Sequence, residues 1–373
     1  MKKISLSLIT LLLIGALSSC STMKQFAPEA DVAKKAKLSP AWIKNLDPVY
    51  DSGNLPIGLQ SPLINEGIVY AGHNTGYMQA YELENGRLIW SEFDGSAYHA
   101  GAIAYKDQVI YGTVQGRVIS RHGIMGTVKY SVDLGASVET KGVVYNGRVF
   151  FQLRNHQVFC LDVETGKIIW GYKRSVPYLT TLQRAATPVV YKDKVLVGFA
   201  DGTFAALSVD EGVLLYETKL TTATKFVDVD NAAFVYSDKV YISPSGGQLS
   251  LIDPNTGKVL RTSDFATSRA PVLRDDQLIF GTPNGEIILT DKNLNPLKTM
   301  KISKGTITSI VPYKTYFAVS TTAGEIKLLD YKTLEVVETY NLGHAYSAVF
   351  GDMVSTPDAL AVLSSRNRLF LFR

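Results

Sequence analysis

Asp162-Val163-Glu164-Thr165-Gly166-Lys167-Ile168-Ile169-Trp170 is the stretch that decides the fold. It has the pattern of a strand end, a tight turn that contains glycine, and the start of a second strand. Similar stretches occupy residues 84–90 and 253–260. A unit that returns about every 40 residues predicts a repeat architecture in which each unit is one supersecondary motif.

Two turn positions mark each repeat. The turn before the last strand of a unit holds Gly86, Gly126, Gly166, Gly212 and Gly257, with Asn295 and Leu334 in the sixth and seventh units. Ten residues earlier stands a second turn position, with Gly76, Gly116, His156, Gly202, Gly247, Gly285 and Gly324. Asn367 supplies this second position in an eighth unit, which ends with the chain. Glycine suits both positions because tight turns between strands often need a positive φ.

Short apolar runs, such as residues 68–70 and 195–197, fill the intervals between the turns. Strands of this length separated by Gly, Asn and Asp indicate four-stranded antiparallel units. The sequence therefore predicts an all-β protein, an eight-bladed β-propeller over residues 41–373. The last unit lacks a fourth strand, and residues 41–46 have the pattern of one, so we expect the N-terminal strand to complete the last blade and close the ring.

An aromatic residue recurs in the last strand of the units. Trp90, Tyr130, Trp170 and Tyr216 occupy this position, and Trp42 would occupy it in the strand that closes the ring. We expect these rings to pack between neighbouring blades, because large aromatic side chains dominate core energetics.

Composition limits the function classes. The 373 residues are 46% hydrophobic and 19% charged, which is typical of a globular protein. Without Lys2 and Lys3 the chain has 36 basic and 34 acidic residues, a balance that argues against nucleic-acid binding. The five histidines and two cysteines show no spacing typical of a zinc site, so the sequence predicts no metal and no cofactor.

The N-terminus predicts a lipid anchor. Residues 1–19 combine Lys2 and Lys3 with a short apolar run, which is the pattern of a signal peptide. Leu17-Ser18-Ser19-Cys20 resembles a bacterial lipobox, which implies a diacylglyceryl group on Cys20 and, since Ser21 is not aspartate, sorting to the outer membrane. Residues 20–40 would then be the lipidated cysteine and a flexible tether to a domain that faces the periplasm. The alternative is an ordinary signal peptide followed by a chance cysteine.

Two neighbouring connectors between units are long, and the segment from Trp42 to Pro62, for which no earlier copy exists to compare, spans 20 residues. From the aromatic position to the next unit the chain takes 18 residues after Trp170 and 17 after Tyr216, but 10 to 12 in three other connectors. Connectors of this kind share one rim of a propeller, and insertions in repeat proteins often mark a binding face. The first contains apolar residues and an arginine, and the second contains two aspartates, a mixture that suits a protein–protein contact. Neutral drift in loop length is the alternative.

The chain resembles the BamB family of outer-membrane lipoproteins. The lipobox, the PQQ-like repeat and both long connectors carry the likeness: residues 176–188 resemble a Pro-Ser-Leu-Ser-Leu-Arg segment with one residue inserted, and Asp228-Val229-Asp230 matches Asp-Val-Asp. In that family these segments bind the POTRA domains of BamA. The resemblance therefore implies Leu182, Arg184, Asp228 and Asp230 as partner-binding residues, with Leu179 as a second candidate because of the insertion. The alternative is structural, in which Arg184 pairs with an aspartate within the protein or the aspartates cap turns.

The resemblance implies a non-enzymatic scaffold of the β-barrel assembly complex that assists the folding and insertion of outer-membrane proteins. Nascent outer-membrane proteins are further expected partners. One alternative is a propeller lipoprotein that binds another envelope partner. Another is a quinoprotein dehydrogenase, which shares the repeat but in most members has adjacent cysteines, whereas Cys160 stands alone here.

Overall fold

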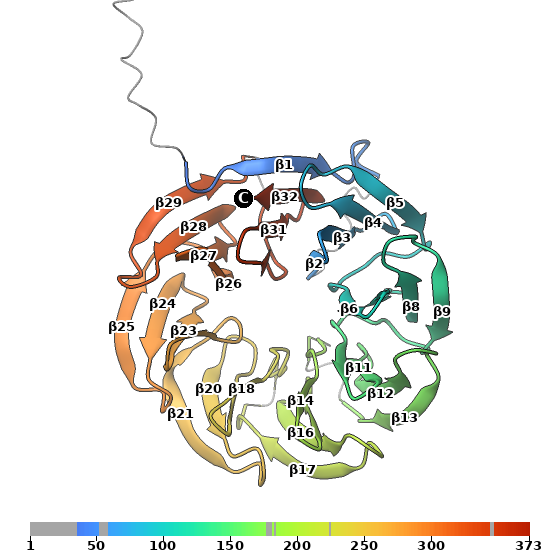
Figure 1. Cartoon of the computed structure of the whole chain (residues 1–373). Coiled ribbons are helices and arrows are strands. Elements are labelled where there is room, and N and C mark those ends of the chain that lie inside the picture. Colours follow the sequence, from blue (N-terminus) through green and yellow to red (C-terminus); the bar gives the residue numbers. More distant parts are fainter. Residues whose placement is uncertain (1–35, 52–58, 177–180, 183, 224, 344–346) are drawn as a thin grey trace, which may run out of the picture. The chain divides into compact units, whose positions relative to one another are not determined.

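The computed structural model describes residues 36–51, 59–176, 181–182, 184–223, 225–343 and 347–373. Two units are distinguished, Met1–Ser39 and Pro40–Arg373. The second unit is a ring of eight four-stranded antiparallel sheets, the blades, which confirms the predicted propeller (Figure 1). Among the described residues, no helix is long and apolar enough to cross a membrane. Cys20 and the predicted signal peptide lie outside the described residues.

Blades 1 to 7 each consist of four consecutive strands ordered from the axis outward. Blades 1 to 3 are β2 (Leu63–Asn65), β3 (Ile68–Gly72), β4 (Tyr77–Glu82) and β5 (Leu88–Phe93); β6 (Ile103–Tyr105), β7 (Gln108–Gly112), β8 (Arg117–His122) and β9 (Val128–Asp133); and β10 (Val143–Tyr145), β11 (Arg148–Gln152), β12 (Gln157–Asp162) and β13 (Ile168–Lys173). Blades 4 and 5 are β14 (Val189–Tyr191), β15 (Lys194–Gly198), β16 (Thr203–Ser208) and β17 (Leu214–Lys219); and β18 (Phe234–Tyr236), β19 (Lys239–Ile242), β20 (Gln248–Ile252) and β21 (Val259–Ala266). Blades 6 and 7 are β22 (Val272–Arg274), β23 (Gln277–Gly281), β24 (Glu286–Thr290) and β25 (Pro296–Lys301); and β26 (Ile307–Tyr313), β27 (Tyr316–Thr321), β28 (Glu325–Asp330) and β29 (Val336–Asn341).

Blade 8 joins the two ends of the propeller. It consists of β30 (Val354–Ser355), β31 (Leu360–Leu363), β32 (Arg368–Phe372) and β1 (Pro40–Asn45). β1 pairs antiparallel with β32, with Trp42 opposite Leu371 and Lys44 opposite Leu369. The predicted closure by the N-terminal strand is therefore confirmed.

The core lies within and between the blades. The second and third strands of a blade are buried on both faces, as in β3, where all residues are buried. The outermost strands alternate between half-buried and exposed residues, as in β17. One cluster joins Tyr70 and Trp90 of blade 1 to Tyr111 of blade 2, so neighbouring blades share their apolar contacts.

The recurring aromatic residues fasten the blades that carry them to the next blade. The Nε1 group of Trp90 donates a hydrogen bond to the Gly123 carbonyl at 2.6 Å, and that of Trp170 donates to the Val209 carbonyl at 2.9 Å. The Trp90 ring also lies against the turn of the following blade, where a Cβ on Gly126 would be 2.9 Å from the ring. The aromatic position is thus a packing site between blades, as the sequence predicted.

The turn of the sixth unit differs from the prediction. Asn295 was expected at the positive-φ position, but Leu294 occupies it with φ of +67°. The Asp291 N–H donates to the Asn295 carbonyl at 3.1 Å, whereas in blade 5 the Asp253 N–H donates to Lys258. The sixth turn is therefore one residue shorter, which moves the left-handed residue back by one position.

Replacing Gly166 with alanine is expected to destabilise the propeller by about 2–4 kcal/mol. Gly166 has φ of +73°, and an added Cβ would overlap the Tyr130 ring of the preceding blade. Gly147 is the matched control, since its φ is +72° and no atom lies within 4 Å of an added Cβ. Urea unfolding of both variants separates the effect of backbone strain from that of the overlap with the Tyr130 ring. Equal losses of unfolding free energy in the two variants would show that the contact between blades contributes nothing.

Candidate binding surface on the connector rim

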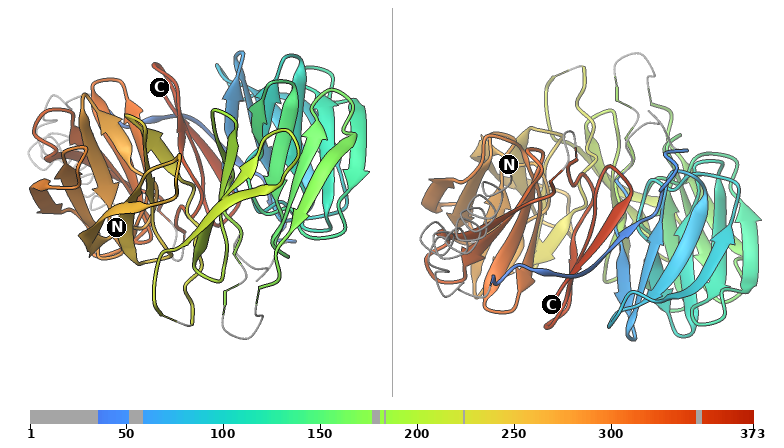
Figure 2. Two further views of the ribbon diagram at one scale, coloured as in Figure 1. Left: turned by 90° about the horizontal axis from the view of Figure 1, so that it is seen from below. Right: turned by 90° about the horizontal axis from the view of Figure 1, so that it is seen from above.

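Two connectors form the candidate surface. Each connector runs from the outermost strand of one blade to the innermost strand of the next. The connectors share one rim of the propeller with the turns between second and third strands. Two hydrogen bonds show this, from the Leu134 N–H to the Gly116 carbonyl and from the Leu220 N–H to the Gly202 carbonyl. We call this the connector rim. The loop that follows β17 extends beyond the blades on this side (Figure 2).

Asp228 joins the two long connectors. Its side chain is fully buried, and its two carboxylate oxygens accept the N–H groups of Leu182 at 2.9 Å and Arg184 at 3.1 Å. The Asp228 carbonyl also accepts the N–H of Ser245 at 2.7 Å. A residue of the second connector thus fixes the backbone of the first, and the two become one surface.

Arg184 and Asp230 form an ion pair across the same junction. Nη1 of Arg184 lies 3.3 Å from Oδ2 of Asp230. The Arg184 side chain is 52% exposed, but that of Asp230 is only 4% exposed. Burial raises the pKa of Asp230, and the nearby Arg184 guanidinium opposes that rise. Only the arginine of this pair reaches solvent. Arg184 therefore pairs with an aspartate within the protein and still presents a positive charge at the surface.

Apolar side chains flank the pair. Leu182 is 44% exposed, and Phe226 is 59% exposed with φ of +54°. A bulky residue with positive φ is strained, and here Val227 and Val229 on either side of Asp228 are buried and hold the segment in place. Phe226 was not among the predicted site residues, although it is the lone aromatic residue of its connector.

We call residues 181–182, 184 and 226–230 the two-loop surface. The structure brings Leu182, Arg184, Asp228 and Asp230 together there, and Leu179 lies outside the described residues. Their role in partner binding stays a prediction. Asp228 and Asp230 are buried, so in the structure they position the loops and do not form the exposed surface.

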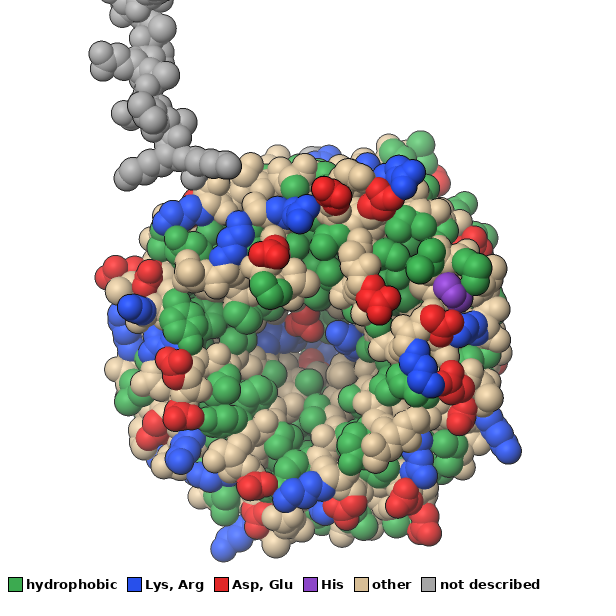
Figure 3. Space-filling model, viewed as in Figure 1, with side chains coloured by type: hydrophobic (Ala, Val, Ile, Leu, Met, Phe, Trp, Pro, Cys, Tyr) green, Lys and Arg blue, Asp and Glu red, His purple; other side chains and the backbone are tan. Residues whose placement is uncertain are grey.

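A cavity of about 380 Å³ opens beside the two-loop surface at the centre of the ring. Residues from all eight blades line it, and Figure 3 shows basic and acidic side chains inside the central hollow. Asp230 belongs to both regions, because it lines the cavity and pairs with Arg184. Lys141 and Arg269 also line it, and no sequence pattern had selected them because they come from distant blades.

The family model and the named relatives agree on one family. A family model described as outer membrane protein assembly factor BamB matches residues 100–293. A relative with that name from Shewanella oneidensis is 21% identical over 330 residues, which are 83% of each chain. Another from Burkholderia pseudomallei is 24% identical over 234 residues, or 61% of each chain.

Solved structures share the fold. The crystal structure of BamB from Moraxella catarrhalis has a TM-score of 0.76 and 19% identity, covering 90% of this chain and 99% of that one. A europium-containing methanol dehydrogenase has a TM-score of 0.68 and 12% identity, covering 87% and 84%. These likenesses show the propeller alone, but the family model spans more than half of the 373 residues. The chain therefore belongs to the family of the outer membrane protein assembly factor BamB.

Proposed function

We propose that this protein is a non-enzymatic scaffold lipoprotein of the outer-membrane β-barrel assembly machinery. The observation that carries the proposal is the junction at Asp228, which builds one surface from the two connectors that resemble the partner-binding segments of the family. Family membership and the names of the relatives, which are outer membrane protein assembly factors, support it.

In this proposal, acyl chains on Cys20 hold the protein at the periplasmic face of the outer membrane. Two or three chains give stable anchoring where one chain does not. The two-loop surface then binds the POTRA domains of BamA, and the docked propeller assists the folding and insertion of outer-membrane proteins. Nascent outer-membrane proteins are further partners in this proposal.

The residues of the surface have different roles in the proposed contact. Leu182 and Arg184 are exposed and contact the partner directly, since apolar and arginine side chains anchor protein interfaces. Phe226 adds a third exposed anchor. Asp228 and Asp230 act indirectly. Asp228 holds the backbone at Leu182 and Arg184, and Asp230 holds the guanidinium of Arg184.

Changing Arg184 to glutamine is expected to weaken binding to the POTRA domains of BamA by about tenfold, because the exposed charge is lost while an N–H donor to Asp230 remains. Arg154→Gln is the matched control, since Arg154 is 53% exposed and pairs with Glu139 at 3.2 Å on the same rim. Biolayer interferometry measures both affinities, and thermal unfolding checks that both variants stay folded. Equal affinities of the two variants would contradict the assignment of Arg184.

Co-purification of the full-length protein from membranes tests the partner itself. We expect BamA to be recovered with the wild type and to be reduced with Arg184→Gln but not with Arg154→Gln. Recovery of a different envelope complex without BamA would overturn the proposed function and favour another envelope partner.

A further inference from the structure

We propose that the cavity on the propeller axis binds a small zwitterion, an amino acid or short peptide with a free ammonium group and a free carboxylate. The proposal does not depend on docking to BamA. It follows from the polar groups that line the cavity, which fall into a cationic set and a set of acceptors that lack donors.

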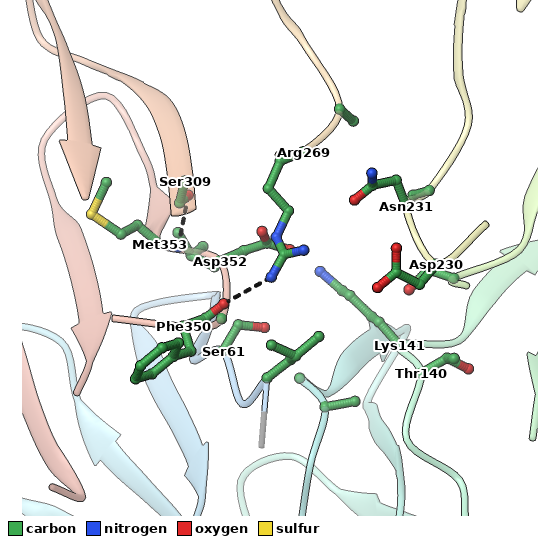
Figure 4. A pocket seen from close by; sticks show the side chains of 18 of the residues that line it. Ser61, Thr140, Lys141, Asp230, Asn231, Arg269, Ser309, Phe350, Asp352 and Met353 are labelled. Carbon is green, nitrogen blue, oxygen red and sulfur yellow. Dashed lines mark hydrogen bonds between the residues drawn. The ribbon is translucent and has the colours of Figure 1, made fainter. Parts of the chain in front are cut away.

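The cationic set consists of Lys141 and Arg269, whose side chains reach into the cavity (Figure 4). The guanidinium of Arg269 is fixed by its hydrogen bond to the Phe350 carbonyl at 3.1 Å and a longer one to the Ser268 carbonyl at 3.4 Å. Lys141 takes part in none of the ion pairs found among the described residues. The positive charge of Arg269 also acts on the Asp230 carboxylate, and Lys141 adds a second positive charge that an anionic group in the cavity can meet.

The acceptor set consists of Asp230 and Asn231. The Oδ1 atoms of both side chains are buried and have no hydrogen-bond donor among the described residues. Their other polar atoms are already engaged, since Asp230 Oδ2 accepts from Arg184 at 3.3 Å and Asn231 Nδ2 donates to Ser243 Oγ at 3.1 Å. In Figure 4 both side chains extend into the cavity from the segment that precedes β18. Buried acceptors of this kind are stabilised when a ligand donates hydrogen bonds to them.

The two sets together select the ligand chemistry. A simple anion would contact Lys141 and Arg269 but leave both Oδ1 atoms without donors, and a simple cation would do the reverse. An α-ammonium group supplies three donors, and a carboxylate in the same molecule supplies the negative charge. The volume of about 380 Å³ is at the lower end of ligand pockets, which favours an amino acid or a dipeptide.

The other acidic residues at the cavity do not change this assignment. Glu139 is already held by Arg154 at 3.2 Å and by the Ser137 hydroxyl at 2.9 Å. Asp352 is exposed to solvent, so the binding of a ligand is not needed to satisfy its carboxylate.

Titration of the full chain with alanyl-alanine, followed by calorimetry and by NMR shifts of the Asn231 side-chain amide, tests the proposal. We expect saturable binding of the dipeptide with both termini free, and affinities at least about tenfold lower for the N-acetylated and the C-amidated forms. If the dipeptide does not bind, or if the blocked forms bind equally well, the proposal is wrong, and ordered water is then the partner of the two acceptors.

Lys141→Met locates the binding site. We expect this variant to bind alanyl-alanine at least about tenfold more weakly and to bind the POTRA domains as the wild type does. Lys304→Met is the matched control, because Lys304 is an exposed lysine of another connector and does not line the cavity. Equal dipeptide affinity of the two variants would place the binding elsewhere and overturn the assignment.

Discussion

Replacing Asp228 with alanine is expected to destabilise the propeller by about 3 kcal/mol and to release the connector between blades 3 and 4. The carboxylate is fully buried and accepts the N–H groups of Leu182 and Arg184 at 2.9 and 3.1 Å. Hydrogen bonds to a charged group contribute about 1.5–3 kcal/mol each, and alanine leaves both donors without this acceptor. Urea unfolding measures the loss of stability, and hydrogen exchange of the Leu182 and Arg184 amides measures the release.

Two further variants make this result specific. Asp228→Asn keeps one acceptor oxygen and is expected to lose about half as much stability. Asp210→Ala removes the 79% exposed partner of Arg148, and an exposed pair of this kind contributes about 0–1 kcal/mol. The proposed junction would be refuted by amides at Leu182 and Arg184 that stay protected in Asp228→Ala.

The junction also determines how loss of partner binding must be interpreted. Asp228→Ala is expected to weaken the proposed binding to BamA because the loop that carries Leu182 and Arg184 is released. Such a loss does not show that Asp228 touches the partner. Arg184→Gln is the more direct probe, since the side chain of Arg184 is half exposed.

The fold could be predicted because its determinants are local and repeated. In blades 1 to 5 the turn glycine lies against an aromatic ring of the preceding blade, as Gly126 lies against Trp90. That contact returns at five successive junctions between blades, so it leaves a periodic pattern that a single sequence reveals. The prediction for the sixth turn was wrong by one residue because Asn295 is itself a common turn residue. The φ of Leu294 and the hydrogen bond from Asp291 to Asn295 show that Leu294 takes the left-handed position.

The candidate site was predictable only in part. The unequal connector lengths placed it on one rim, and the family resemblance supplied Arg184 and Asp228. Burial of Asp228 depends on how blades 4 and 5 pack around the connector, which is not encoded near that residue. The cavity was not predicted for the same reason, since Lys141, Asp230 and Arg269 come from connectors of three different blades and meet only when the ring closes.

Closure of the ring by β1 is expected to have the second large effect. A chain that begins at Asp47 lacks β1, and we expect it to be destabilised by about 5 kcal/mol or more. Trp42 donates a hydrogen bond to the Leu83 carbonyl at 3.0 Å, and its ring lies 2.8 Å from the position of a Cβ on Gly86 of blade 1. The Trp42 ring is half-buried, so its loss costs less than the about 3–5 kcal/mol of a fully buried aromatic side chain. Leu46 is buried and is lost with it, and the backbone of β32 also loses its neighbour.

Urea unfolding of this chain, compared with one that begins at Ala36 and retains all of β1, measures the contribution of the closing strand. A peptide of residues 40–46 added to the shortened chain is expected to restore the transition, because β32 offers an antiparallel edge in the register of Trp42 with Leu371. The same peptide with Trp42→Ala keeps the backbone hydrogen bonds and is expected to restore much less, since it lacks the ring that packs on the turn of blade 1. If both peptides restored stability equally, the backbone pairing alone would close the ring, and the aromatic position would have no role in joining blade 8 to blade 1.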